Sequence, residues 1–198
     1  MTAPLVLASG SAIRRTMLEA AGVPFHVKPA RVDEDALKDA LSDLKLRDLA
    51  DALAEAKALR GSQAAPDQLV LGADSMLELA DGTRLDKPEN PEAARAQLSA
   101  MSGGTHKLHA AAVIAENGAA VWRHVDTARL HVRILSDDFI AAYVEAEWDS
   151  IRHTSGCFEY EGRGAQLFSR VDGSHFTILG LPLLPLLAFL RARKMMPS

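Results

Sequence analysis

The sequence opens with an apolar run that is followed by a segment with apolar residues at helical spacing. The run covers residues 4–8 and predicts a buried strand. Residues 12–21 predict a helix, because apolar side chains recur on one face and Ser11 stands at the N-cap position. A second strand is expected over residues 24–32. Strands and helices in alternation predict an α/β fold.

The rest of the chain continues this alternation. Asp81-Gly82 and Asn117-Gly118 stand between strand-like segments and predict hairpin turns. Further strands are expected over residues 69–75, 76–80, 83–85, 106–115, 119–134, 166–171 and 175–179, the last two as a hairpin. Further helices are expected over residues 35–44, 46–60 with Gly61 as the stop, 90–102, 136–147 and a closing segment after Pro182.

The candidate chemistry centres on residues 69–75. Five apolar or small residues run into Asp74, as expected for a buried strand whose last residue emerges at the carboxyl edge of the sheet. Ligands bind at that edge in open α/β sheets. The hairpin that follows delivers Lys87 to the same edge, and a carboxylate beside an ammonium group suits a metal-phosphate site. Alternatively, Asp74 only caps a turn.

Other charged groups have two interpretations from the residues alone. Arg14 and Arg15 lie in a first helical turn, where cations oppose the helix dipole, so an anion among the backbone N–H groups would explain them. They could equally be solvated on an exposed face. Glu34 follows Asp33 at an expected helix start, where acids serve as caps. Lys57 lies beside an apolar helical stripe, and periodicity alone predicts a solvated lysine.

Composition limits the class of function. Hydrophobic residues make up 48% of the 198 residues, enough for one α/β domain or two small lobes. A formal net charge of -4 argues against a surface that coats nucleic acid, so we expect no DNA or RNA polymer as partner. The single Cys157 excludes an internal disulfide and a multi-cysteine metal site. The start lacks signal-peptide order, and the longest apolar run, residues 178–190, falls short of the ~20 residues of a membrane span. We therefore expect a cytoplasmic protein with no membrane partner.

Several familiar motifs are absent from the sequence. It has no G-x-x-x-x-G-K-[ST] loop, no G-x-G-x-x-G after a strand, and no H-E-x-x-H zinc pattern. G-x-S-x-G is also absent, which disfavours a serine hydrolase. What remains is a distributed set of a small-residue turn, arginines, acids and lysines.

The order and local sequence of that set resemble the Maf family of nucleoside triphosphate pyrophosphatases over nearly the whole chain. Residues 7–11, Leu-Ala-Ser-Gly-Ser, followed by Arg14-Arg15, resemble the family's opening motif Leu-Ala-Ser-x-Ser-Pro-x-Arg-Arg, with Ala12 in place of proline. Later blocks match in the same order at residues 32–34, 53–58, 72–74, 87–88, 102–106 and 180–183.

This resemblance implies a single Maf-like domain over residues 1–198, with a central mixed sheet flanked by helices, two lobes and an active-site cleft between them. It implies a cytoplasmic, often homodimeric enzyme that hydrolyses a nucleoside triphosphate to the monophosphate and pyrophosphate with Mg²⁺ or Mn²⁺. Asp74 would take a proton from water and, with Glu34, hold the metal. Phosphates would be bound by Arg14, Lys57 and the catalytic Lys87, with Ser9 and Ser11 in the turn that cradles them.

Three positions match family positions associated with substrate choice, namely Ile13, Ser75 and Glu161. Residues 158–162 resemble the branch that acts on 7-methyl-GTP more than the branch that acts on dTTP and UTP. A carboxylate at Glu161 could accept N–H bonds from a guanine edge. Alternatively, Glu161 is a solvated loop acid. Ile13 and Ser75 match neither branch.

Two other functions are compatible with the sequence. One is a nucleotide-binding regulator of cell division without significant catalysis, as the family's historic name suggests. The other is a phosphatase that removes single phosphates. Binding alone does not need a base, so Asp74 together with Lys87 favours the pyrophosphatase, acting on non-standard or surplus nucleoside triphosphates.

Overall fold

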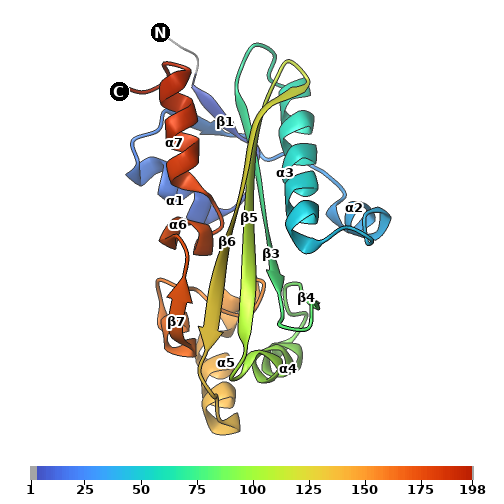
Figure 1. Ribbon diagram of the computed structural model, residues 1–198, viewed down its shortest axis with the longest axis vertical. Helices are drawn as coiled ribbons and strands as arrows, with labels where there is room; N and C mark the ends of the chain where they lie inside the picture. Colours follow the sequence, from blue (N-terminus) through green and yellow to red (C-terminus); the bar gives the residue numbers. More distant parts are fainter. Residues whose placement is uncertain (1–3, 198) are drawn as a thin grey trace. The chain divides into compact units, whose positions relative to one another are not determined.

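The computed structural model describes residues 4–197, and within them the backbone forms one seven-stranded sheet flanked by helices (Figure 1). The strands are β1 (Leu5–Leu7), β2 (Phe25–Val27), β3 (Val70–Glu78), β4 (Arg84–Leu85), β5 (Thr105–Glu116), β6 (Ala119–Val132) and β7 (Phe168–Asp172). The helices are α1 (Ala12–Ala20), α2 (Glu34–Ala40), α3 (Leu46–Gln63), α4 (Pro91–Met101), α5 (Asp137–Ile151), the 3-10 helix η1 (Arg163–Leu167), α6 (His175–Ile178) and α7 (Leu183–Ala192).

The sheet is mixed. Its strand order is β2-β1-β3-β5-β6-β7, and β4 pairs with β3 alone. β1 pairs in parallel with β2 and β3, whereas β4 runs antiparallel to β3 and β7 antiparallel to β6. The predicted α/β fold with a central mixed sheet is therefore confirmed.

The chain divides into two compact units. The first consists of Met1–Ser75, His109–Asp126 and Ser174–Ser198, and the second of Met76–Leu108 and Thr127–Gly173. Strands β3, β5 and β6 contribute residues to both units. The single Maf-like domain over residues 1–198 stays a prediction.

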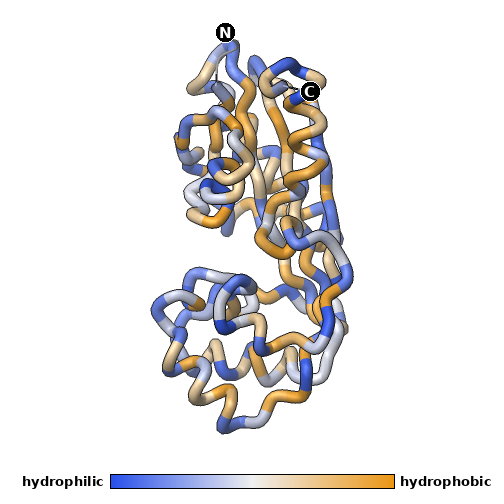
Figure 2. The backbone as a smooth tube through the Cα atoms, turned by 90° about the vertical axis from the view of Figure 1, so that its left-hand side faces the viewer, coloured by the Kyte–Doolittle hydropathy of each residue, from blue (hydrophilic) through white to orange (hydrophobic). Residues whose placement is uncertain are grey.

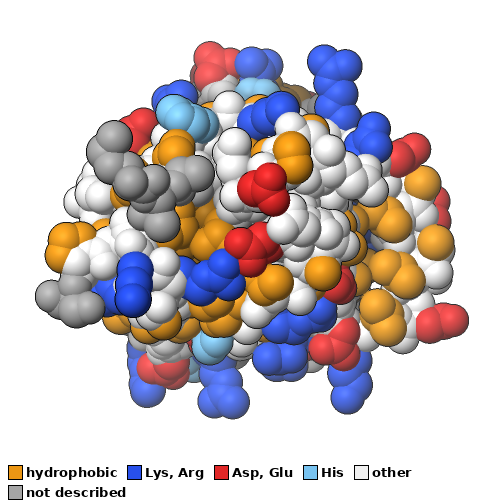
Figure 3. All heavy atoms as spheres, turned by 90° about the horizontal axis from the view of Figure 1, so that it is seen from above, with side chains coloured by type: hydrophobic (Ala, Val, Ile, Leu, Met, Phe, Trp, Pro, Cys, Tyr) orange, Lys and Arg blue, Asp and Glu red, His pale blue; other side chains and the backbone are white. Residues whose placement is uncertain are grey.

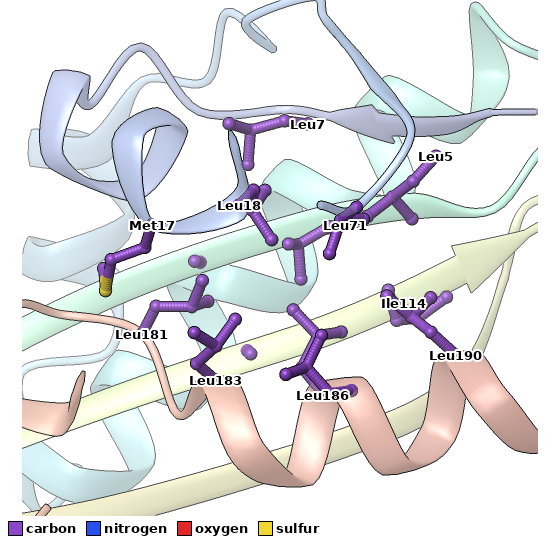
Figure 4. Close-up of a cluster of buried hydrophobic side chains, with 14 of the residues drawn as sticks. Leu5, Leu7, Met17, Leu18, Leu71, Ile114, Leu181, Leu183, Leu186 and Leu190 are labelled. Atoms are coloured by element: carbon purple, nitrogen blue, oxygen red, sulfur yellow. The ribbon is translucent and has the colours of Figure 1, made fainter. Parts of the chain in front are cut away.

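The main core of the first unit lies between the sheet and the helices α1 and α7, which cover one of its faces (Figure 1). Alternate residues of the strands, such as Leu5, Leu7 and Leu71, point into this core and meet Leu186 and Leu190 of α7 (Figure 4). Hydrophobic residues recur along the strands and α7, while the connecting loops are more hydrophilic (Figure 2). Burial of this apolar surface stabilises the unit.

Helix α3 covers the opposite face of the sheet in the first unit, and small residues let it approach closely (Figure 1). A Cβ built on Gly61 would lie 2.7 Å from Cγ1 of Val70 and 3.1 Å from Cβ of Ala8. The prediction that Gly61 stops the helix is wrong, because α3 continues through it to Gln63. Gly61 instead removes a side chain where the helix meets the sheet.

In the second unit, α4 and α5 pack against one another. The side chain of Asn90 caps α4 and that of Ser136 caps α5, as their positions before each helix predict. Cys157 is fully buried here, and Phe158 packs edge-on against Phe168.

Several further expectations can be compared with the backbone. Ser11 caps α1 as predicted, and Asn117-Gly118 joins β5 to β6 with both residues at positive φ. The expected strand over residues 24–32 is wrong in length, because β2 ends at Val27, two residues before Pro29. The expected hairpin over residues 166–179 is also wrong, since β7 pairs with β6 and residues 175–178 form α6. The hydroxyl of Thr177 in α6 donates to Asp126 at 2.6 Å.

Among the residues described, no helix has the length and apolar character that crossing a membrane requires.

Candidate functional site

Two adjacent residues of β3 point to opposite faces of the sheet in the first unit. Because side chains alternate along a strand, Leu71 and Ala73 face the core beneath α1 and α7, while Gly72 and Asp74 face α3. Ser75 returns to the side of Ala73. The sequence Ala73-Asp74-Ser75 therefore contributes to two different clusters of polar side chains.

The first cluster joins Asp74 to Lys57 and Glu34. The ammonium nitrogen of Lys57 lies 2.7 Å from Oδ1 of Asp74 and 2.9 Å from Oε1 of Glu34. The side chains of Lys57 and Asp74 are 9% and 10% exposed, whereas that of Glu34 is 44% exposed. The cluster is thus buried at its base and reaches solvent at Glu34.

The position of Lys57 depends on the close contact between α3 and β3. A Cβ on Gly72 would overlap the carbonyl oxygen of Ala54 and lie 2.5 Å from the backbone nitrogen of Ala58. Lys57 belongs to the same helical turn as these alanines, so its side chain extends along β3 toward Asp74, two residues beyond the glycine. Periodicity alone predicts a solvated Lys57, and that expectation is wrong because its residue is 7% exposed.

Glu34 is positioned by helix α2, of which it is the first residue. The carboxylate of Asp33 caps this helix by accepting from the backbone N–H of Ala36 at 3.1 Å. Glu34, the first helical residue, pairs with Lys57. The two neighbouring acids therefore have different partners, one within the helix and one in the cluster.

The second cluster is built around Arg14, which is 9% exposed. Its guanidinium donates through Nε to the Gly180 carbonyl oxygen at 2.9 Å and through Nη1 to the Ala73 carbonyl oxygen at 2.9 Å. Nη1 also donates to the hydroxyl of Ser9 at 3.1 Å, and Nη2 donates to that of Ser75 at 3.0 Å. Four of the five guanidinium N–H groups thus donate within the described chain. Arg14 ties the turn after β1 to β3 and to the segment before α7.

The electrostatics of the two clusters are connected. Burial lowers the pKa of Arg14, and the carboxylates of Asp74 and Glu34 oppose that shift. On the face of the molecule seen from above in Figure 3, basic and acidic side chains are interspersed.

The turn after β1 places the remaining residues of the opening motif. The hydroxyl oxygen of Ser9 accepts from the backbone N–H of Ser11 at 3.3 Å, and Ser11 caps α1. Ile13 is partly buried and packs against the main core. Arg15 is exposed and pairs with Glu19 at 3.8 Å. Of the two arginines, Arg14 is thus buried and Arg15 lies on the surface.

Lys87 and Glu161 belong to the second unit, where both are exposed. Lys87 follows β4, whose pairing of Leu85 with Leu77 confirms the predicted hairpin around Asp81-Gly82. Glu161 lies in the turn before η1. Their participation in the site with Asp74 stays a prediction.

The donor set allows a test of the predicted metal. The described residues contain no group of three or more His, Cys, Asp or Glu side chains placed to hold a metal ion. Asp74 and Glu34 do, however, present two carboxylate oxygens within 3 Å of one point, the nitrogen of Lys57. Magnesium is commonly bound by one or two carboxylates plus substrate phosphates. The residues present therefore fit a metal that enters with a polyphosphate.

The sequence placed Gly72 in a buried strand and Gly180 before the closing helix, but it did not predict the contacts that these two glycines make. Gly180 has a φ of +89° and accepts from Arg14, and a Cβ there would lie 2.8 Å from the hydroxyl oxygen of Ser75. Gly72 interrupts an apolar strand, which is a signal of close backbone approach. That signal could have indicated the contact with α3. The contact of Gly180 with Arg14 joins residues that are 166 positions apart, so no local pattern could have indicated it.

The fold and the clusters define an α/β protein with a buried carboxylate–ammonium pair beside the ends of its parallel strands. The family model for "Maf-like protein" matches residues 4–193, and the chain belongs to this family. Two curated relatives are similar to the chain over 98% of its length. One, a nucleoside triphosphate pyrophosphatase of Ruegeria pomeroyi, is 52% identical over 98% of its own length. The other, from Sphingopyxis alaskensis and with the same name, is 51% identical over 99% of its length. Among solved structures, that of the Staphylococcus aureus Ham1 protein covers 96% of this chain and 100% of its own, with 16% identity and a TM-score of 0.47.

Proposed function

We propose that this protein hydrolyses nucleoside triphosphates to the nucleoside monophosphate and pyrophosphate at the cluster of Asp74, Lys57 and Glu34. The observation that carries the proposal is the buried 2.7 Å contact between Lys57 and Asp74 in a chain of the Maf-like family. Relatives that are 52% and 51% identical over nearly the whole chain are named for this activity, which supports it.

The charges of the cluster suit a substrate that brings a divalent cation. Two carboxylates and one ammonium group leave a net negative charge, which would repel a bare triphosphate. Glu34 and Asp74 would hold Mg²⁺ or Mn²⁺ together with substrate oxygens. The bound ion would polarise the phosphate groups and offset their negative charge.

The reaction needs a base and groups that stabilise the leaving pyrophosphate. Asp74 accepts a proton from the attacking water. Water attacks the α-phosphorus, the bond to the bridging oxygen breaks, and its electron pair leaves with pyrophosphate. Lys57 and Lys87 stabilise the negative charge that develops on this group. Arg14, which has one guanidinium N–H beyond the four that donate within the first unit, contributes from the first turn of α1, beside Ser9 and Ser11.

The proposed substrate is a surplus or modified triphosphate, with 7-methyl-GTP as the first candidate. Glu161 would accept N–H bonds from the guanine edge, and the positive charge of the methylated base would favour a carboxylate there. Ile13 and Ser75 would complete the selection. We further propose that the enzyme acts in the cytoplasm as a homodimer.

The experiment that tests this function is a screen of triphosphates with Mg²⁺ or Mn²⁺, in which pyrophosphate is resolved from orthophosphate. The set contains common, methylated and deaminated bases. We expect pyrophosphate and monophosphate in equal amounts, with the highest rate for 7-methyl-GTP. Orthophosphate as the first product would indicate a phosphatase. Nucleotide binding without turnover of any triphosphate would support the regulatory alternative.

A further inference from the structure

The ammonium group of Lys57 lies at the place where the two proposed metal ligands converge. Its nitrogen is 2.7 Å from Asp74 and 2.9 Å from Glu34, and its side chain is 9% exposed. These are the distances of charge-assisted hydrogen bonds. One buried cation therefore already neutralises part of the charge of both carboxylates.

A divalent cation that bound the same two carboxylate oxygens would meet this ammonium group at close range. Like charges repel strongly in a site of low dielectric constant, so both cations would not share the oxygens. Lysine has a flexible four-carbon stem and a compact charge, which lets its nitrogen move while the helix backbone stays in place. In contrast, α3 itself is held by the close contact at Gly72.

We propose that Lys57 is the exchangeable counter-ion of the carboxylate pair. Its ammonium group neutralises Glu34 and Asp74 while the site lacks a metal, and it transfers to the phosphates of the substrate when a divalent cation takes its place. This inference rests on the proposed metal-dependent function and assigns Lys57 two successive partners. The 44% exposure of Glu34 gives the incoming ion and phosphates access to the pair from solvent.

Exchange of this kind couples the binding of metal to the binding of nucleotide. Without nucleotide, the metal must displace Lys57 from both carboxylates and leave the ammonium group without an anion. With nucleotide, the phosphates receive the displaced ammonium group. The metal and the triphosphate should therefore bind cooperatively, and by linkage each should raise the affinity for the other by the same factor.

The test measures Mn²⁺ binding by electron paramagnetic resonance in wild type and Lys57→Met. Titrations are made at pH 8 with and without a triphosphate analogue that carries a methylene bridge between the α- and β-phosphorus. We expect Lys57→Met to bind Mn²⁺ alone at least about tenfold more tightly than wild type, because the competing charge is removed. The analogue should raise Mn²⁺ affinity in wild type and do so about tenfold less in the variant.

Lys45→Met is the matched control. It removes a lysine charge at the N-cap of the same helix, where the side chain is exposed and makes no capping hydrogen bond. Its Mn²⁺ affinity should equal that of wild type. Equal or weaker Mn²⁺ binding by Lys57→Met would overturn the inference, since it would make Lys57 a fixed structural contact.

Two further measurements keep the outcomes separate. Circular dichroism and thermal unfolding establish whether each variant is folded. If Lys57→Met is not folded, Lys57→Gln takes its place in the same comparison. Pyrophosphate release by wild type tests the proposed function independently. Release by wild type together with unchanged Mn²⁺ affinity in the variant would overturn the counter-ion exchange alone. Tighter Mn²⁺ binding by the variant without release by wild type would support the exchange and overturn the pyrophosphatase.

Discussion

Gly72 of β3 lies against the carbonyl oxygen of Ala54 in α3, so close that a Cβ on the glycine would overlap that oxygen. The contact sets the separation of helix and strand. Lys57 follows Ala54 by less than one helical turn, and Asp74 follows Gly72 by two residues on the same face of β3. The 2.7 Å pair of Lys57 and Asp74 is therefore a consequence of a glycine at position 72.

Gly72→Ala should lower the free energy of unfolding by about 1–3 kcal/mol, since the added methyl group must displace backbone atoms of α3. Chemical denaturation measures this change. Gly162→Ala is the control, because a Cβ there would be 3.7 Å or more from its neighbours and φ is not positive. The control should stay within about 0.5 kcal/mol of wild type. An equal effect of both substitutions would contradict the conclusion that Gly72 is required for the close contact between α3 and β3.

Asp74→Asn should reduce the turnover number for triphosphate hydrolysis by about 10²–10⁴-fold, because the amide does not accept the proton of the attacking water. Nucleotide binding, measured by calorimetry, should remain. Asp149→Asn removes an exposed acid of α5 in the second unit and should leave the turnover number unchanged. Near-parental rates in Asp74→Asn would show that another group is the base.

Local patterns in the sequence were sufficient to predict much of the fold around Asp74. The apolar run that ends in Asp74 correctly indicated a buried strand, while the catalytic role of Asp74 stays a prediction. The prediction that the strand ends at this edge is wrong, because β3 continues to Glu78. The neighbouring parallel strand β1 is only 3 residues long and ends at Leu7, which pairs with Leu71 of β3. Asp74 therefore lies in the part of β3 that extends past the end of β1. The length of a neighbouring strand is a property of the sheet and not of the local pattern.

Contacts between distant segments account for what the sequence did not predict. Arg14 receives its acceptors from Ala73 and Gly180, which are 59 and 166 residues away along the chain. Of the two interpretations of Arg14, the solvated one is wrong, because its guanidinium is buried and donates to carbonyl and hydroxyl oxygens of the first unit. Its role in phosphate binding stays a prediction.

The neighbouring arginines should respond very differently to the same substitution. Arg14→Lys should lower the free energy of unfolding by at least about 2 kcal/mol, because a lysine leaves several buried acceptors without a donor. Arg15→Lys should change it by less than about 0.5 kcal/mol, since its ion pair with Glu19 is exposed. Chemical denaturation of both variants measures the difference. Equal losses would contradict the buried, multiply bonded state of Arg14.

Cys157 should be unreactive in the folded protein. Burial raises the pKa of its thiol to about 12. At pH 8 its thiolate fraction should be about a thousandfold below that of an unburied thiol. The neutral thiol favours the folded state, so this contribution to stability is present at low pH and is lost as pH rises from about 9 to about 12. Labelling with an aromatic disulfide reagent at pH 8 should be slow until denaturant is added. Rapid labelling of native protein would contradict this burial.

Glu161→Gln tests the proposed selection of the base. A glutamine retains one acceptor oxygen but removes the negative charge that favours a methylated, cationic guanine, and a hydrogen bond to a charged group contributes more than one to a neutral group. The ratio of kcat/KM for 7-methyl-GTP to that for GTP should therefore fall by about tenfold. Glu159→Gln removes an exposed charge two residues away in the same segment and should leave the ratio unchanged. A loss of activity that is equal for both substrates in Glu161→Gln would assign this residue to general stability of the segment. A ratio unchanged by either substitution would make Glu161 a solvated loop acid, and base selection would then have to come from Ile13 and Ser75 in the first unit.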